Sequence, residues 1–177
     1  MTRKIPNAEL GRLSTEEFRG AEKFPFVLVL DNIRSMNNIG SMFRTADAFR
    51  IEEILLCGIT ACPPHREIQR SALDATESVT WRYFEHSREA VEYLRSQGYS
   101  IYAVEQAEPR IFLNEMQVIP GQRIALIMGN EVHGVDDELL DLADGCIEIP
   151  QYGTKHSFNV AVSAGIVLWE LFNKLKQ

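Results

Sequence analysis

The sequence predicts an α/β protein with a mostly parallel sheet and helices on both of its faces. Short, continuously apolar runs of the kind that become buried strands alternate with amphipathic segments of helical length. The chain has 177 residues, of which 45% are hydrophobic, which suits one domain with a single substantial core. The sequence contains no internal repeat, low-complexity tract or long linker that would indicate another architecture.

The expected elements follow the chain in order. Ser14-Thr-Glu-Glu17 has the form of a capping box and predicts a short helix, with another expected over 7–13. Strands are expected at 26–30, 54–57, 100–104, 123–128 and 146–149, with a weaker one at 79–84. Helices are expected at 38–49, 88–97 and 157–175. Residues 1–24 therefore form a short helical appendage, and residues 25–177 form the domain.

Composition excludes several classes of protein. The longest apolar run, roughly residues 160–169, is about half of the ~20 residues that a membrane span needs. The first ten residues lack the apolar stretch of a signal peptide, so we expect the mature chain to begin there and to be cytoplasmic. Cys57, Cys62 and Cys146 cannot all pair, which is typical of a reducing compartment.

The net charge of −7 is unevenly distributed. Residues 101–150 contain two basic and ten acidic residues, whereas the rest of the chain is nearly neutral. An anionic partner can therefore dock on the first hundred residues. The basic residues there include Arg3, Lys4, Arg12, Arg34, Arg44, Arg50, Arg66 and Arg70. Solvated helix faces are the alternative interpretation of these residues taken singly.

Ligands of open α/β sheets bind beyond the carboxyl ends of strands, which directs attention to the segments after Leu30, Met128 and Ile149. None carries the Gly-x-Gly-x-x-Gly turn of dinucleotide sites, and the chain has no P-loop. After Leu30, Asn38-Ile-Gly40 leads into a helix, and Arg44 follows. Gly40 is expected to permit a tight turn and Arg44 to project toward the loops above the sheet. The structural alternative makes Asn38 a helix N-cap and Arg44 a surface residue.

The two later strand ends lead into polar loops that contain glycine. Gly129 and Gly134 bracket Glu131, and the loop after Ile149 ends in Ser157-Phe-Asn, at the start of the last expected helix. Backbone groups of such loops can hold a flat heterocycle and its ribose. A solvated acid and a helix N-cap are the alternatives for Glu131 and Ser157.

A metal site is not expected. Cys57, Cys62 and His65 lack Cys-x-x-Cys spacing and offer only three ligands.

Taken together, three segments resemble the motifs of the SpoU/TrmH-type RNA 2′-O-ribose methyltransferases of the SPOUT superfamily. They are Asn38-Ile-Gly-x-x-x-Arg44-Thr, Leu126-Ile-Met-Gly-Asn-Glu131-x-x-Gly-Val, and Ile149-Pro-x-x-Gly-x-x-x-Ser157-Phe-Asn159-Val-x-Val. The resemblance extends over roughly residues 27–171. It implies that residues 25–177 are a SPOUT methyltransferase domain whose C-terminal segment, about 126–162, forms a deep trefoil knot.

The resemblance also implies a cofactor, a reaction and partners. S-adenosyl-L-methionine would be held by Met128, Gly129, Ile149, Ser157 and Asn159. The methyl group would pass to a ribose 2′-hydroxyl of tRNA or rRNA, and the partners would be RNA and a second copy of the chain, with neither DNA nor a membrane. The long apolar helix at the C-terminus is consistent with a dimer interface, or with intramolecular core.

The family's catalytic positions fall on Arg44, Asn38, Glu131 and Asn159. Arg44 stands where the family places the proton acceptor, but a guanidinium stays protonated at ordinary pH. Our hypothesis is therefore that Arg44 binds the adjacent phosphate and lowers the pKa of the hydroxyl. Glu131 is expected to orient Arg44 or to fix its loop, and Ser157 to touch the cofactor or cap the last helix.

The sequence leaves two other functions to weigh. One is a knotted RNA-binding module without catalysis, which would act in RNA folding or ribosome assembly. The net negative charge of the chain and the lack of a larger N-terminal RNA-binding domain favour this alternative. A signalling receiver domain would need an acidic cluster after the first strand, and Asp31 has no acidic neighbour. The sequence does not identify the RNA or the nucleotide that is modified.

Overall fold

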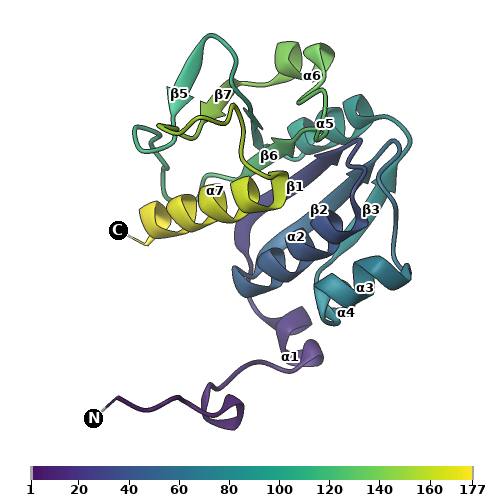
Figure 1. Cartoon of the computed structure of the whole chain (residues 1–177), viewed down its shortest axis with the longest axis vertical. Coiled ribbons are helices and arrows are strands. Elements are labelled where there is room, and N and C mark those ends of the chain that lie inside the picture. The colour runs from purple at the N-terminus through teal and green to yellow at the C-terminus, as the bar shows by residue number, and fades with distance from the viewer. Residues whose placement is uncertain (1, 177) are drawn as a thin grey trace.

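The computed structural model describes residues 2–176, which form a seven-stranded sheet in which every pairing is parallel. The strand order is β3-β2-β1-β6-β4-β7-β5 (Figure 1). The strands are β1 (Phe24–Asp31), β2 (Ile51–Cys57), β3 (Trp81–Phe84), β4 (Ser100–Val104), β5 (Arg110–Phe112), β6 (Ile124–Met128) and β7 (Gly145–Glu148). The predicted α/β fold is confirmed.

Helices cover both faces of the sheet, as expected. They are α1 (Thr15–Gly20), α2 (Met36–Ala48), α3 (Arg66–Ala72), α4 (Ala75–Ser78), α5 (Ser87–Ser96), α6 (Asp137–Leu142) and α7 (Val160–Leu175), with a 3₁₀ turn at Asn7–Glu9. The side chains of β1 alternate between the two faces of the sheet, and both faces are covered, so this strand is buried on both sides. Phe26 and Leu28 join the core that includes residues of α2, α3 and α7, whereas Val27 and Val29 join the core that includes residues of α5 and α6.

The N-terminal appendage is tied to the domain through α1. Ser14 caps this helix with the predicted capping box. Phe18 is 5% exposed and belongs to the same core as α2 and α7, while Arg19 Nε donates to the carbonyl of Glu77 at 3.0 Å. None of the helices within residues 2–176 combines the length and apolar character that crossing a bilayer requires.

Four short elements were not expected from the sequence: α3, α4, β5 and α6. Each has between three and seven residues, too few for a periodic pattern to be distinctive. Their conformations depend on tertiary contacts: β5, for example, pairs with β7 and lies at the edge of the sheet. The knot concerns how residues 126–162 thread through a loop, which strand order does not test, so it stays a prediction.

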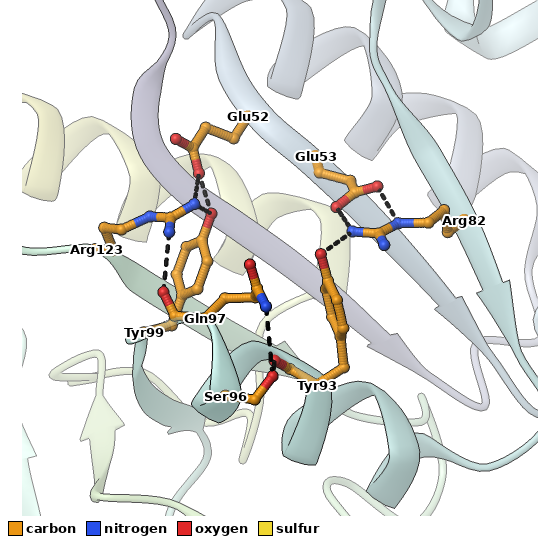
Figure 2. A network of polar contacts seen from close by, with 8 residues as sticks. All are labelled: Glu52, Glu53, Arg82, Tyr93, Ser96, Gln97, Tyr99 and Arg123. Atoms are coloured by element: carbon orange, nitrogen blue, oxygen red, sulfur yellow. Dashed lines mark hydrogen bonds and ion pairs between the residues drawn. The ribbon is translucent and has the colours of Figure 1, made fainter.

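A polar network fixes the amino-terminal ends of the strands, at the edge opposite the loops singled out above (Figure 2). Arg82 of β3 donates to both carboxylate oxygens of Glu53, at 2.6 and 2.5 Å, and to the hydroxyl of Tyr93 at 2.8 Å. Arg123 donates to the hydroxyl of Tyr99 at 2.7 Å. The donors and acceptors of these side chains are hydrogen-bonded to one another, which indicates that the network has a structural role.

Gly40 lies inside α2 and not in a tight turn, so that expectation is wrong. A Cβ at this position would lie 2.0 Å from Ser71 Oγ and 2.3 Å from the carbonyl oxygen of Ile68, both on α3. The glycine is needed because α2 and α3 pack at close range.

Replacing Gly40 with Ala should therefore destabilise the protein by about 1–3 kcal/mol, despite the better helix propensity of alanine. Urea unfolding would measure the change. Gly20→Ala is the matched control, because a Cβ at Gly20 meets no atom within 4 Å. Equal stability of the two variants would contradict the packing explanation.

Candidate functional site

The carboxyl ends of β6 and β7 open into a cavity of about 780 Å³. The loops that follow these strands, which we call the Glu131 loop (129–135) and the Ser157 loop (149–159), provide much of its wall. The lining includes the residues that the resemblance assigns to the cofactor, namely Met128, Gly129, Ile149, Ser157 and Asn159. These residues, from separate segments of the chain, therefore line one contiguous hollow, of a volume common among small-molecule sites.

Close packing within the Glu131 loop depends on its first glycine. A Cβ on Gly129 would lie 2.3 Å from the carbonyl carbon of Gly134 and from the nitrogen of Val135. Asn130 closes the loop, since its Oδ1 accepts from the amides of Val132 and His133 at 2.9 and 3.2 Å. Sequence reasoning missed this role of Asn130, although asparagine between loop glycines is a typical turn signal.

Glu131 fastens the segment between β1 and α2. Its carboxylate accepts from the backbone amides of Arg34 and Ser35, at 2.9 and 3.0 Å, and from Asn38 Nδ2 at 2.9 Å. Of the two roles expected for Glu131, fixing a loop is therefore the one seen, and the loop belongs to the first motif. Ser35, and not Asn38, is the N-cap of α2, with its Oγ accepting from the amide of Asn38.

Asn159 continues this set of contacts to α7. Its Nδ2 donates to Asn38 Oδ1 at 3.1 Å. Its Oδ1 accepts from the amides of Ala161 and Val162, so Asn159 is itself the N-cap of α7. The expectation that Ser157 caps this helix is wrong, because the helix begins three residues later, at Val160. Three of the four predicted catalytic side chains thus form one hydrogen-bonded chain, Glu131–Asn38–Asn159.

Arg44 lies apart from this chain. It follows Asn38 by six residues, which places it about 9 Å farther along α2 and about 240° around its axis. Its exposed side chain lines a second hollow of about 660 Å³. The guanidinium makes no hydrogen bond or ion pair with another residue in 2–176. The expectation that Arg44 projects toward the loops above the sheet is therefore wrong, and Glu131 does not orient it.

The two hollows have opposite charge. Four acidic residues line the first, Glu105, Glu131, Asp137 and Glu148, the last of them ion-paired with Arg110 at 2.8 Å, and within residues 2–176 no Lys or Arg lines it. Four cations line the second, namely Arg12, Arg44, Arg50 and Lys176, together with two carboxylates, Asp47 and Asp74. We call the first the acidic cavity and the second the basic groove.

Helices α2 and α7 connect the two hollows. They run parallel, because Asn38 meets Asn159 at their first turns, and the rings of Phe49 and Trp169 lie 6.2 Å apart near their other ends (Figure 1). The acidic cavity lies at the beginning of the helix pair and the basic groove at its end. A ligand that uses both hollows must extend along this pair.

The pKa of Glu131 lies below its ordinary value of 4.5. Partial burial alone would raise this pKa, but the hydrogen bonds from Arg34, Asn38 and Ser35 outweigh it. A lowered pKa in the folded state means that the carboxylate stabilises the fold fully above about pH 4.5. This contribution is lost as the pH falls through the lowered folded-state value.

Glu131→Gln should accordingly lower the free energy of unfolding by about 1 kcal/mol at pH 7. The difference from wild type should shrink as both proteins are measured at decreasing pH below 4.5. Glu115→Gln, at an exposed loop position, serves as the control and should differ little from wild type at any pH. A Glu131→Gln deficit that persists undiminished at pH 3 would show that the carboxylate charge is not what fastens the loop.

Comparison with known proteins yields one family. The chain is 28% identical over 162 residues to the tRNA (guanosine(18)-2′-O)-methyltransferase of Thermus thermophilus, covering 92% of this chain and 81% of that protein. It is 33% identical over 148 residues to the 23S rRNA (guanosine(2553)-2′-O)-methyltransferase of Bacillus subtilis, covering 82% of this chain but 57% of the relative.

Among solved structures, an AdoMet-bound rRNA methyltransferase from Sinorhizobium meliloti matches with a TM-score of 0.80 and 27% identity. The match covers 89% of this chain and 60% of that one. The chain therefore spans less than two thirds of some of its relatives. The model of the SpoU rRNA Methylase family matches residues 25–169, which include every element from β2 to β7 and the cavity loops. This protein accordingly belongs to the SpoU rRNA Methylase family.

Proposed function

We propose that this protein is an S-adenosylmethionine-dependent methyltransferase that methylates a ribose 2′-hydroxyl of tRNA or rRNA in the cytoplasm. The single observation that carries the proposal is the hydrogen-bonded chain Glu131–Asn38–Asn159 at the rim of an acidic cavity. Family membership and the names of the relatives agree with this reaction.

The acidic cavity fits the cofactor. S-adenosylmethionine carries two positive charges, on sulfur and on the amino group, against one carboxylate, so its net charge is positive. The cavity is lined by four acidic residues, of which, among the described residues, only Glu148 forms an ion pair, with Arg110, and its described lining includes no lysine or arginine. Such a lining favours this molecule over a nucleotide phosphate. Met128, Gly129, Ile149, Ser157 and Asn159 are the residues that would hold it.

The reaction requires positioning and a route for one proton. When bound, S-adenosylmethionine supplies a methyl group on a positively charged sulfur, and a carbon–oxygen bond replaces the carbon–sulfur bond. Asn38 and Asn159 would orient the ribose, because their amides are held by Glu131 and by the first turn of α7. Arg44 would hold the same RNA through a phosphate that reaches the basic groove, and the proton of the hydroxyl would pass to phosphate or water.

RNA would bind along the helix pair toward the basic groove. Its four cations give an overall acidic chain a local surface for phosphate.

Transfer of labelled methyl groups to total RNA from a host that lacks this protein tests the function. We expect a new 2′-O-methylnucleoside, detected by mass after digestion, and its loss with Arg44→Ala. Arg44→Lys should lower kcat/KM about tenfold or more, because lysine lacks the planar fork of guanidinium. Near-full activity of Arg44→Lys would show that the planar fork of the guanidinium is not required. Cofactor binding without transfer would favour the alternative, a catalytically inactive RNA-binding module.

The chain would act as a homodimer through α7. Val162 and Trp169 are 50% and 57% exposed, and they lie two helical turns apart on the same side of the helix. Ile166, half-buried between them, completes an apolar stripe. An exposed stripe of this kind suits a second copy of the chain.

Trp169→Lys should therefore shift the sedimentation mass from twice the chain's 20.1 kDa to a single chain. Ile119→Lys is the control, since Ile119 is 66% exposed in the loop before β6. A Trp169→Lys protein that remains dimeric would move the interface elsewhere, and a monomeric wild type would exclude the dimer.

A further inference from the structure

Two polar residues, Glu105 and Gln106, directly follow β4 and line the acidic cavity. Strand β4 lies between β6 and β7 in the sheet. The end of β4 therefore lies between the starting points of the Glu131 loop and the Ser157 loop. Neither residue belongs to the three motifs, and the resemblance gives them no role.

Glu105 contacts the Glu131 loop. Its Oε2 accepts from the amide of Val135 at 3.0 Å, and its Oε1 accepts from the amide of Gln106 at 2.8 Å. Gly134 has φ +73°, a backbone conformation that favours glycine, and a Cβ there would lie 2.2 Å from Glu105 Oε2. The Glu131 loop thus approaches the carboxylate of Glu105 closely.

Gln106 contacts the Ser157 loop. Its Nε2 donates to the carbonyl of His156 at 2.5 Å. Residues 150–158 are neither helix nor strand, and within the described chain no other hydrogen bond ties this segment to the rest of the protein. Residues 152–158 are exposed, with Tyr152 at 97%. Between the end of β7 and Asn159, which is anchored to Asn38, the side chain of Gln106 is therefore the polar contact that holds this part of the cavity wall.

We propose that Glu105 and Gln106 are positioning residues that hold the two cavity loops at the separation S-adenosylmethionine requires. Glu105 holds the Glu131 loop through Val135, and Gln106 latches the Ser157 loop through His156. This inference rests on the proposed function. Because the latch is a single neutral hydrogen bond, the Ser157 loop can open to admit the cofactor and close when Gln106 engages it.

Calorimetric binding of S-adenosylmethionine to the full chain is the test. Glu105→Ala should weaken binding roughly tenfold to a hundredfold, since it removes a charged acceptor from a part-buried amide. Glu105→Gln keeps an acceptor oxygen and should stay within about threefold of wild type. Gln106→Ala should weaken binding roughly fivefold. Glu108→Ala is the control, because Glu108 is a neighbouring exposed residue that does not line the cavity.

Two further readouts separate positioning from a general loss of structure. In Gln106→Ala, KM for the cofactor should rise while kcat at saturating cofactor stays within about twofold. Hydrogen exchange over 150–158 should slow when wild type binds the cofactor and stay fast in this variant.

Wild-type affinity and wild-type exchange in both alanine variants would overturn the inference and leave the proposed function intact. A wild-type chain that does not bind the cofactor would overturn the proposed function and this inference with it.

Discussion

The arrangement of the site depends on one carboxylate, that of Glu131, which accepts three N–H groups from the first motif. Two of these come from the backbone before α2, and the donor at Arg34 is 97 residues away in sequence. The third comes from Asn38, whose amide oxygen then accepts from Asn159. A loop acid thereby fixes the start of α2 relative to the start of α7, and the cavity wall depends on both.

Under the proposed function, this geometry would let an acidic chain act on RNA. The parallel pair α2 and α7 separates charge, with carboxylates around the cavity at one end and Arg44 in the basic groove toward the other. A positively charged cofactor and a polyanion favour opposite electrostatic environments. Opposite local charge at the two ends of one helix pair lets each occupy its own hollow.

Much of the fold could be predicted from the sequence, because apolar strands and long amphipathic helices have distinctive patterns. The elements that were missed are short and depend on packing, as α3 depends on the close approach of Gly40 in α2. In the site, motif order identified Glu131, Asn38 and Asn159 but not how they connect. Which hollow the side chain of Arg44 faces depends on the residue at which α2 begins. The contacts of Glu105 depend on the position of β4 between β6 and β7. No local sequence pattern encodes either feature.

The central claim is that Glu131, Asn38 and Asn159 act as one unit, and a double-mutant cycle tests it most directly. Asn38→Ala, Asn159→Ala and the double variant would be compared by kcat/KM for RNA methylation, with unfolding curves to verify folding. Members of one unit are not additive, so the double variant should be about as impaired as the worse single variant. Losses that multiply would show that the two asparagines work independently, and would contradict the account.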